Sequence, residues 1–215
     1  VQFTKIPVRE LRSALNKSDI VALRTSANSP KDHAALAQLS SNFTEFIQRG
    51  GSLILDRSIA EFFGEFHFQA SKGKAPTIAQ AGMNLLPNCF LICATGDSPR
   101  STDDLLAILR KHPRTVGVRL EDETMLILSG RKMTCHGNGS ATFALAGNEN
   151  TAQRVESITT QRSRRQSQRS YLIDLTEWRR DAIDRTIDPF PPARPQTPFV
   201  ENGTLVIVGG GGMPR

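Results

Sequence analysis

The sequence predicts an α/β domain built on a mainly parallel sheet flanked by helices. Two short apolar runs, Ile20–Leu23 and Ser52–Leu55, are typical of strands that are buried on both faces. Between them, Asp32–Arg49 carries apolar residues at helical spacing, and Gly50–Gly51 ends this segment. These apolar residues are Leu36, Leu39, Phe43, Phe46 and Ile47. A further helix is expected at Ser58–Phe66, and strand, helix, strand and helix in this order predict parallel strands with right-handed crossovers.

The middle of the chain predicts one more strand and helix, followed by a short antiparallel region. Asn88–Cys93 is apolar and has the length of a strand. Thr102–Lys111 has a helical pattern with acidic residues in its first turn, where they interact favourably with the helix dipole. Three short runs with turns between them then indicate antiparallel strands. These runs are Val116–Arg119, Thr124–Ser129 and Lys132–His136.

The composition changes near residue 148, and we expect the α/β domain to span residues 1–147. Residues 148–187 are rich in Gln, Arg, Ser and Thr, which predicts a basic connector that can include a helix. Residues 188–202 are rich in proline and predict an extended linker. A β-branched run then leads into glycines, so residues 203–215 are expected to form the opening strand and Gly-rich loop of a following, truncated domain.

The composition excludes several classes of protein. Hydrophobic residues make up 38% and charged residues 22% of the chain, which is typical of a globular protein and not of a disordered one. No apolar run approaches the roughly 18 residues of a membrane-spanning helix. The three cysteines, Cys89, Cys93 and Cys135, lack metal-ligand spacing and are expected to be buried free thiols. The sequence therefore predicts no metal site, no cofactor and no membrane partner.

Both ends of the chain suggest a piece of a longer protein. The chain begins at Val1, without a methionine and without the pattern of a secretory signal. Signal segments of the longer protein would lie outside this sequence, so the location is unknown and the cytoplasm is the expectation. At the other end, the glycines of Gly209–Gly212 follow a strand and normally lead into a helix, yet the sequence stops at Arg215.

Ser58 is the candidate nucleophile. It follows a predicted buried strand and opens a helix, and a sharp turn of this kind exposes a serine hydroxyl near backbone N–H groups that can stabilise an oxyanion. Its neighbours Arg57 and Ile59 are bulky where such a turn normally has small residues, so an N-cap role is the alternative. A nucleophilic serine also needs a base. The four histidines, none with a distinctive spacing, are His33, His67, His112 and His136.

The basic segment supplies a candidate binding site. The net charge of +6 results from 27 Lys and Arg against 21 Asp and Glu, and much of the excess lies between Arg154 and Arg180. Arg164 and Arg165 are the candidate residues for binding phosphates or an acidic partner. The alternative is a solvated connector, because aromatic residues are only 6% of the chain and no platform of them is interleaved with the arginines to stack on bases.

Three stretches, read together, resemble the cyanophycinase and peptidase E family of serine peptidases. Ala81–Asn88, AGMNLLPN, is similar to the Gly-x-Gly-Leu-Leu-Pro segment of that family. Val116–Thr124, VGVRLEDET, is similar to its Gly-Ile-Gly-Ile-Asp-Glu-Asp-Thr stretch, and Cys135–Ala141, CHGNGSA, to its closing Gly-Ser-Gly turn. The resemblance covers about Asp19–Ala146 and implies a class I glutamine-amidotransferase-like fold, in a degenerate copy that lacks its first strand.

The resemblance also implies roles for individual residues. Ser58 stands at the position of the family's nucleophile, without the neighbouring glycines. Asn28 lies where the family has an oxyanion-hole loop, and Asp122 is the acidic residue that fits the family's pattern. Cys93–Asp97 replaces the segment that carries the family's catalytic histidine. An acid without its histidine cannot activate Ser58.

The expected function is therefore that of a cyanophycinase-like domain that is inactive alone and supports an adjacent peptidase domain. The resemblance implies peptides as substrates, including β-aspartyl-arginine polymers, whose acidic chains the basic connector could hold. The expected partners are the following domain of the same longer chain, such a peptide or acidic polymer, and a second copy in a homodimer. One alternative is an active serine hydrolase in which His33 or His67 activates Ser58. The other is a nucleic-acid-binding module whose affinity falls steeply with salt.

Overall fold

The computed structural model describes residues 7–24, 30–69, 77–94, 101–159, 172–186 and 203–209. The helices are η1 (Val8–Glu10), α1 (Leu11–Lys17), α2 (Pro30–Ala37), α3 (Ser40–Gln48), α4 (Arg57–Ala60), η2 (Glu61–Phe63), α5 (Thr102–Lys111) and α6 (Leu175–Asp184). The strands are β1 (Ile20–Leu23), β2 (Ser52–Asp56), β3 (Phe66–Gln69), β4 (Thr77–Ala81), β5 (Cys89–Cys93), β6 (Val116–Leu120), β7 (Thr124–Ser129), β8 (Lys132–Gly137), β9 (Ser140–Leu145), β10 (Arg154–Thr159), β11 (Leu172–Asp174) and β12 (Thr204–Gly209).

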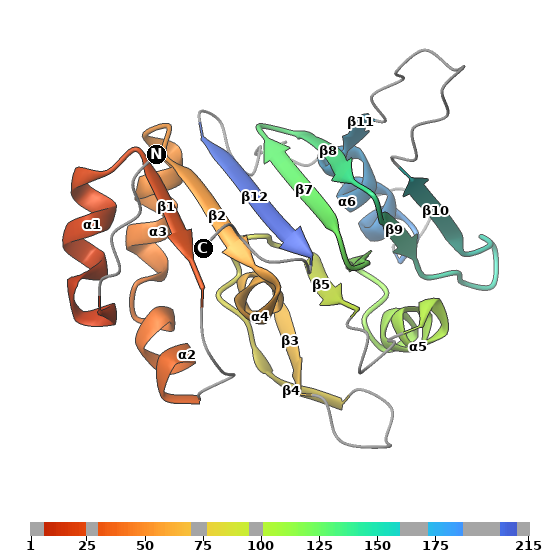
Figure 1. Ribbon diagram of the computed structural model, residues 1–215. Coiled ribbons are helices and arrows are strands. Elements are labelled where there is room, and N and C mark those ends of the chain that lie inside the picture. Colours follow the sequence, from red (N-terminus) through yellow and green to blue (C-terminus); the bar gives the residue numbers. More distant parts are fainter. Residues whose placement is uncertain are drawn as a thin grey trace, which may run out of the picture.

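The largest sheet has six strands in the order β1-β2-β12-β7-β8-β11 (Figure 1). β1 and β2 are parallel, and β12 is parallel to β2. On its other side β12 is antiparallel to β7, and the remaining neighbours, β7 with β8 and β8 with β11, are also antiparallel. A four-stranded sheet, β10-β9-β6-β5, has one parallel pair, β5 with β6, and β3 pairs with β4 in a separate ribbon.

The predicted α/β class is correct, but the prediction of a mainly parallel sheet is wrong. Both larger sheets are mixed and largely antiparallel. The physical reason lies in the connections, because parallel neighbours need a long crossover whereas a tight turn joins antiparallel ones. Helices α2 and α3 connect β1 to β2, and α5 connects β5 to β6. A tight turn at Gly130, whose φ is +58°, joins β7 to β8.

Two predicted helices are shorter in the structure than the sequence pattern suggested. The segment expected as one helix over Asp32–Arg49 forms α2 and α3, separated at Gln38 and Leu39. The segment expected as a helix over Ser58–Phe66 forms α4 and η2, and Phe66 already begins β3. The helix expected at Thr102–Lys111 is confirmed, and Ser101 caps it by accepting a hydrogen bond from the Asp104 N–H.

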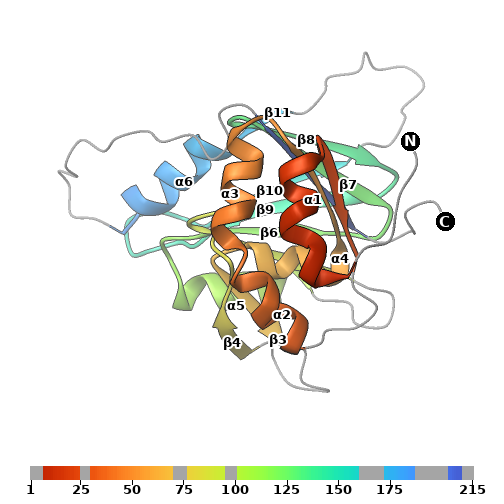
Figure 2. The same cartoon turned by 90° about the vertical axis from the view of Figure 1, so that its left-hand side faces the viewer.

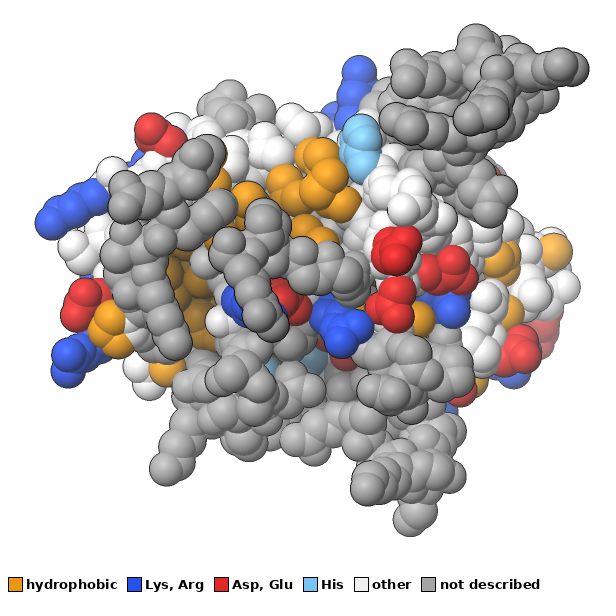
Figure 3. Space-filling model, in the orientation of Figure 1, with side chains coloured by type: hydrophobic (Ala, Val, Ile, Leu, Met, Phe, Trp, Pro, Cys, Tyr) orange, Lys and Arg blue, Asp and Glu red, His pale blue; other side chains and the backbone are white. Residues whose placement is uncertain are grey.

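The two sheets pack face to face, and the core lies between them and under helices α1 and α3. Figure 2 shows α1 and α3 on the same side of the six-stranded sheet as the four-stranded sheet. Leu53 and Leu55 of β2 are fully buried on this side, as are Phe43 of α3 and Phe143 of β9. Residues that alternate with the buried ones, such as Ile54, are partly exposed on the opposite face. Hydrophobic side chains are visible on that face in Figure 3.

Strand β12 lies in the middle of the six-stranded sheet. Leu205 and Ile207 are almost completely buried. Gly203 precedes the strand, and a Cβ atom at this position would lie 2.3 Å from the carbonyl oxygen of Ile47, so a side chain does not fit. The division of the chain at residues 147, 187 and 202 stays a prediction. In the described ranges, no helix is long and apolar enough to cross a membrane.

Arg49 joins helix α1 to the end of helix α3. Its guanidinium group donates hydrogen bonds to the carbonyl oxygens of Leu15, Asn16 and Ser18, at 3.0 Å for Asn16 and 3.1 Å for Ser18. These carbonyl groups lie at the C-terminus of α1, where helical carbonyls lack intrahelical partners. The guanidinium carbon also lies 5.3 Å from the centre of the Phe46 ring. Arg49 therefore holds α1 in place through its side chain.

We expect Arg49→Ala to lower the free energy of unfolding by about 1–2 kcal/mol, because charged hydrogen bonds to the α1 carbonyls are lost. Arg49→Lys should recover only part of this loss, since an ammonium group lacks the planar fork of donors. Urea denaturation measures both changes. Arg110→Ala, at an exposed arginine of α5, is the matched control. Equal effects of Arg49→Ala and Arg110→Ala would contradict this role of Arg49.

Candidate functional site

The candidate site lies at the carboxyl ends of the three parallel strands β1, β2 and β12. Ligands of open α/β sheets commonly bind outside the carboxyl ends of the strands. Arg24 follows β1, Arg57 and Ser58 follow β2, and Gly209 ends β12. Because β12 pairs with both β2 and β7, Gly209 lies opposite Thr124, the first residue of β7. The turn Glu121–Glu123 between β6 and β7 is thereby brought to the same edge.

Ser58 lies in helix α4, immediately after β2. The strand-to-helix turn expected from the sequence is therefore present, and Ser58 is the second residue of the helix. The N-cap position, which precedes the first helical residue, belongs to Asp56. The next residues, Ile59 and Ala60, are buried at 1% and 0% exposure and fix α4 against the core. The structure places the backbone of Ser58 and does not describe its side chain.

Asp122 contacts helix α4 through Arg57, the residue before Ser58. The Nη1 atom of Arg57 donates a hydrogen bond to Oδ1 of Asp122 at 3.1 Å. Both side chains are partly exposed, so the ion pair contributes at most about 1 kcal/mol to stability. Its importance is chemical. Asp122, the candidate acid, is paired with Arg57, which directly precedes the candidate nucleophile Ser58.

A second ion pair lies on the same edge. The Nε atom of Arg24 is 3.5 Å from Oδ2 of Asp56, and the Asp56 side chain is the more buried of the two. The edge therefore alternates two guanidinium groups with two carboxylates, from Arg24 and Asp56 to Arg57 and Asp122. Figure 3 shows basic and acidic side chains close together on this side of the molecule. An arrangement of this kind can exchange its internal ion pairs for contacts with a charged ligand.

Glu121 fixes the turn that presents Asp122. One carboxylate oxygen of Glu121 accepts a hydrogen bond from the backbone N–H of Ser140 at 3.2 Å, and the other accepts one from Nη1 of Arg119 at 2.9 Å. The hydrogen bonds from Ser140 and Arg119 lower the pKa of the Glu121 carboxyl below its ordinary value, against the effect of burial. The turn therefore depends on the ionised form of Glu121.

Two of the four histidines meet beside η2, the helical turn that continues α4. The ring of His33 stacks on that of Phe62, with centroids 4.6 Å apart and planes at 12°. His67 is buried, and its ring lies edge-on to Phe62 at 5.2 Å and to His33 at 5.5 Å. Phe62 lies four residues after Ser58, about one helical turn. His33 and His67 therefore pack on the helical turn that directly continues the helix that carries Ser58.

The other two histidines lie in different surroundings. His112 follows α5, and its ring centroid is 4.7 Å from that of Phe66. Burial and the neighbouring charge of Lys111 lower the pKa of His112. His136 is an exposed residue of β8, and its Nε2 atom is 3.2 Å from the hydroxyl of Thr134.

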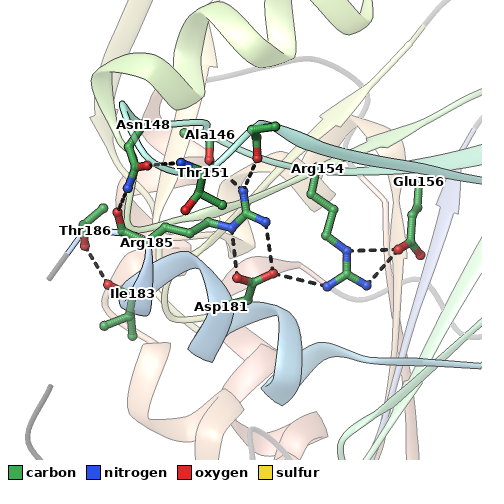
Figure 4. Close-up of polar contacts among 10 residues, drawn as sticks. Ala146, Asn148, Thr151, Arg154, Glu156, Asp181, Ile183, Arg185 and Thr186 are labelled. Carbon is green, nitrogen blue, oxygen red and sulfur yellow. Dashed lines mark hydrogen bonds and ion pairs between the residues drawn. The ribbon is translucent and has the colours of Figure 1, made fainter. Parts of the chain in front are cut away.

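The candidate binding residues Asn28, Arg164 and Arg165 lie outside the described residues. Other arginines of the basic region are described, and they bind acidic groups of the same chain (Figure 4). Arg185 donates from Nε to Oδ1 of Asp181 at 2.9 Å and from Nη1 to the carbonyl oxygens of Ala146 and Ala152. These contacts tie α6 to the loop between β9 and β10, which is a structural role.

Arg154 of β10 extends this network. Its Nη1 atom donates to Oδ2 of Asp181 at 3.2 Å, and its Nη2 atom donates to Oε1 of Glu156 at 2.7 Å. Its guanidinium carbon lies 4.1 Å from the centre of the Trp178 ring, a cation–π contact. Burial raises the pKa of Asp181, but the hydrogen bonds and charges of Arg185 and Arg154 outweigh it and lower the pKa below the ordinary value. Arg154 and Arg185 are thus already engaged within the fold.

The cysteines do not add a nucleophile. All three are buried and none forms a disulfide within the described residues, as the sequence predicted. Burial raises the pKa of the Cys89 thiol to about 12 and that of Cys135 to about 11, so both stay protonated at neutral pH. Within the described ranges, no three His, Cys, Asp or Glu side chains are grouped so that they could hold a metal ion.

Sequence reasoning missed the partners of the residues that it singled out. Arg57 was noted only as a bulky neighbour of Ser58, and Arg24 and Asp56 were not noted at all. One signal was available, because each of these residues stands at the end of a predicted parallel strand, and such ends meet at one edge of a sheet. The packing of His33 and His67 on Phe62 had no signal in the sequence, since it joins three separate elements.

Comparison of the chain with protein-family models, with curated proteins and with solved structures finds no match.

We expect Glu121→Gln to lower stability at neutral pH, because glutamine cannot supply a charged acceptor to both Ser140 and Arg119. The pKa of Glu121 is lower in the folded state than in the unfolded state, where a glutamate has a pKa of about 4.3. Its contribution is therefore complete above that value and is lost as the pH falls through the folded pKa. Urea denaturation of both proteins from neutral to acidic pH should show their difference shrinking.

Glu149→Gln, at an exposed glutamate of the loop after β9, is the control for the loss of a surface charge. A difference between Glu121→Gln and the unmodified protein that stays constant into acid would contradict this assignment.

Proposed function

We propose that this chain is a cyanophycinase-like domain that has no peptidase activity of its own and supports an adjacent peptidase domain. The family assignment rests on the resemblance of Ala81–Asn88, Val116–Thr124 and Cys135–Ala141 to segments of that family. The proposal that the chain has no peptidase activity rests on the ion pair between Arg57 and Asp122.

In a serine triad, the acid accepts a hydrogen bond from a histidine and thereby orients the histidine as a base. Asp122 instead accepts a hydrogen bond from Arg57. A guanidinium group stays protonated at any physiological pH and has no acceptor atom, so it cannot take the proton of a serine. Arg57, the residue before Ser58, therefore pairs with the carboxylate of Asp122 but cannot act as a base.

The local packing also supports a domain without catalysis. Ile59 is buried directly after Ser58, where a catalytic strand-to-helix turn normally has a small residue that permits the sharp bend. At the same time the domain retains a large apolar core, which includes Phe43, Phe63 and Phe143. A well-packed domain whose candidate acid is paired with an arginine is suited to a supporting role.

A fluorophosphonate probe, which reacts with activated serines, tests the absence of catalysis. We expect no labelling of Ser58 in the folded chain, because no base activates its hydroxyl. Intact-protein mass spectrometry and peptide mapping measure the labelling. Ser58→Ala is the test variant, and Ser13→Ala, at an exposed serine of α1, is its matched control. Labelling that Ser58→Ala abolishes and Ser13→Ala leaves unchanged would overturn the proposal.

The supporting role is tested in a protein that joins this chain to a peptidase domain. Ser58→Ala should leave peptide hydrolysis by that protein unchanged. Leu53→Asp, which places a charge in the core of this chain, should lower hydrolysis because the supporting domain unfolds. Loss of hydrolysis with Ser58→Ala would show that the chemistry resides in this chain instead.

An active serine hydrolase is the second candidate function, and the packing of His33 and His67 against Phe62 favours it. If one of these histidines activates Ser58, His33→Gln or His67→Gln should lower probe labelling at least about a hundredfold, the usual contribution of a general base. His136→Gln, at an exposed histidine of β8, is the control. Labelling that is absent from the unmodified chain, or equal in all three variants, would exclude this candidate.

A further inference from the structure

The turn between β8 and β9 carries an Asn–Gly pair that contacts the turn of the candidate site. Asn138 is exposed, and its backbone N–H donates to the carbonyl oxygen of Glu123 at 3.0 Å. Its side-chain Nδ2 atom donates to Oε2 of Glu123 at 3.2 Å. Asn138 is thus a neutral donor to the acidic turn Glu121–Glu123, which presents Asp122 to Arg57.

The structure requires a glycine after this asparagine. A Cβ atom at position 139 would lie 2.2 Å from the carbonyl oxygen of Asp122 and 2.4 Å from Oγ1 of Thr124, closer than any side chain can come. The absence of a Cβ atom at Gly139 also leaves its backbone nitrogen open to the side chain of the preceding residue. Among the hydrogen bonds of the described residues, none has the N–H of Gly139 as its donor. No hydrogen bond to a described backbone carbonyl group therefore has to break before the N–H of Gly139 loses its proton.

We propose that Asn138 is a site of spontaneous deamidation. The deprotonated backbone nitrogen of Gly139 attacks Cγ of Asn138 and forms a new C–N bond. The bond between Cγ and Nδ2 breaks, and the side-chain nitrogen leaves as ammonia after it takes up a proton. Water then opens the resulting cyclic imide at either carbonyl group. The products are aspartate and isoaspartate at position 138.

The product alters the turn through charge. Aspartate at position 138 replaces the Nδ2 donor with a carboxylate, which faces the Glu123 carboxylate across the 3.2 Å contact that the amide now makes. Asp122 and Glu121 add two more acidic groups to the same turn. Like charges at this separation repel one another. Isoaspartate in addition lengthens the backbone between β8 and β9, so both products loosen the turn that holds Asp122.

Incubation of the folded chain at about pH 7 and about pH 9, followed by peptide mapping, tests the proposal. We expect the replacement of the amide by a carboxyl group at residue 138, with a rate that rises up to about tenfold per pH unit, because the reaction needs the deprotonated backbone nitrogen. The sequence has a second Asn–Gly pair at residues 202–203, and the mapping separates the two. Asn138→Ser, which cannot form the imide, should keep its mass at this position.

The charge effect has a test of its own. Asn138→Asp should lower the midpoint of urea denaturation relative to Asn138→Ser, because only the aspartate repels Glu123. Incubation of the chain in concentrated urea provides the reference rate of the unfolded chain. Reaction at residue 138 in urea but not in the folded chain would overturn the proposal, because the turn would then protect the asparagine. Equal midpoints of the two variants would overturn the effect on the turn.

Discussion

Strand β12 pairs with both β2 and β7 and thereby joins the two parts of the six-stranded sheet. The strand is parallel to one neighbour and antiparallel to the other. Without it, β1 and β2 would be separated from β7, β8 and β11, and two long sheet edges would be exposed. Leu205 and Ile207 of β12 are buried in the core, and their burial stabilises this arrangement of strands. The middle of the sheet is therefore built from the last segment of the chain that the structure describes.

The same strand assembles the candidate site. In the sheet, Val208 lies opposite both Asp56 and Met125, so the end of β2 and the start of β7 are fixed one strand apart. Arg57 and Asp122 are 65 positions apart in the sequence and meet across this end of β12. An ion pair between exposed groups contributes little to stability. Its effect is on chemistry, because Asp122 is paired with the guanidinium group of Arg57, which cannot act as a base.

The local elements could be predicted from the sequence, and their arrangement only in part. The apolar runs of β1 and β2 and the amphipathic pattern of α5 were sufficient to predict these elements. The spacing of apolar residues along the chain differs between a helix and a strand that bury one face. The prediction of parallel strands held for β1 with β2. It failed for the sheets as a whole, because a short apolar run has the same pattern whether its neighbours run parallel or antiparallel.

The sequence alone was sufficient to predict strands β1, β2 and β5, helix α5, the burial of the cysteines, and the position of Ser58 directly after a strand. Only the tertiary structure decided that Asp122 pairs with Arg57, that His33 and His67 share Phe62, and that Arg154 and Arg185 bind Asp181. The physical reason is the range of the interactions. Local propensity and hydrophobic spacing act over a few residues. These contacts instead join residues that are far apart in the sequence, and they form only after the strands have paired.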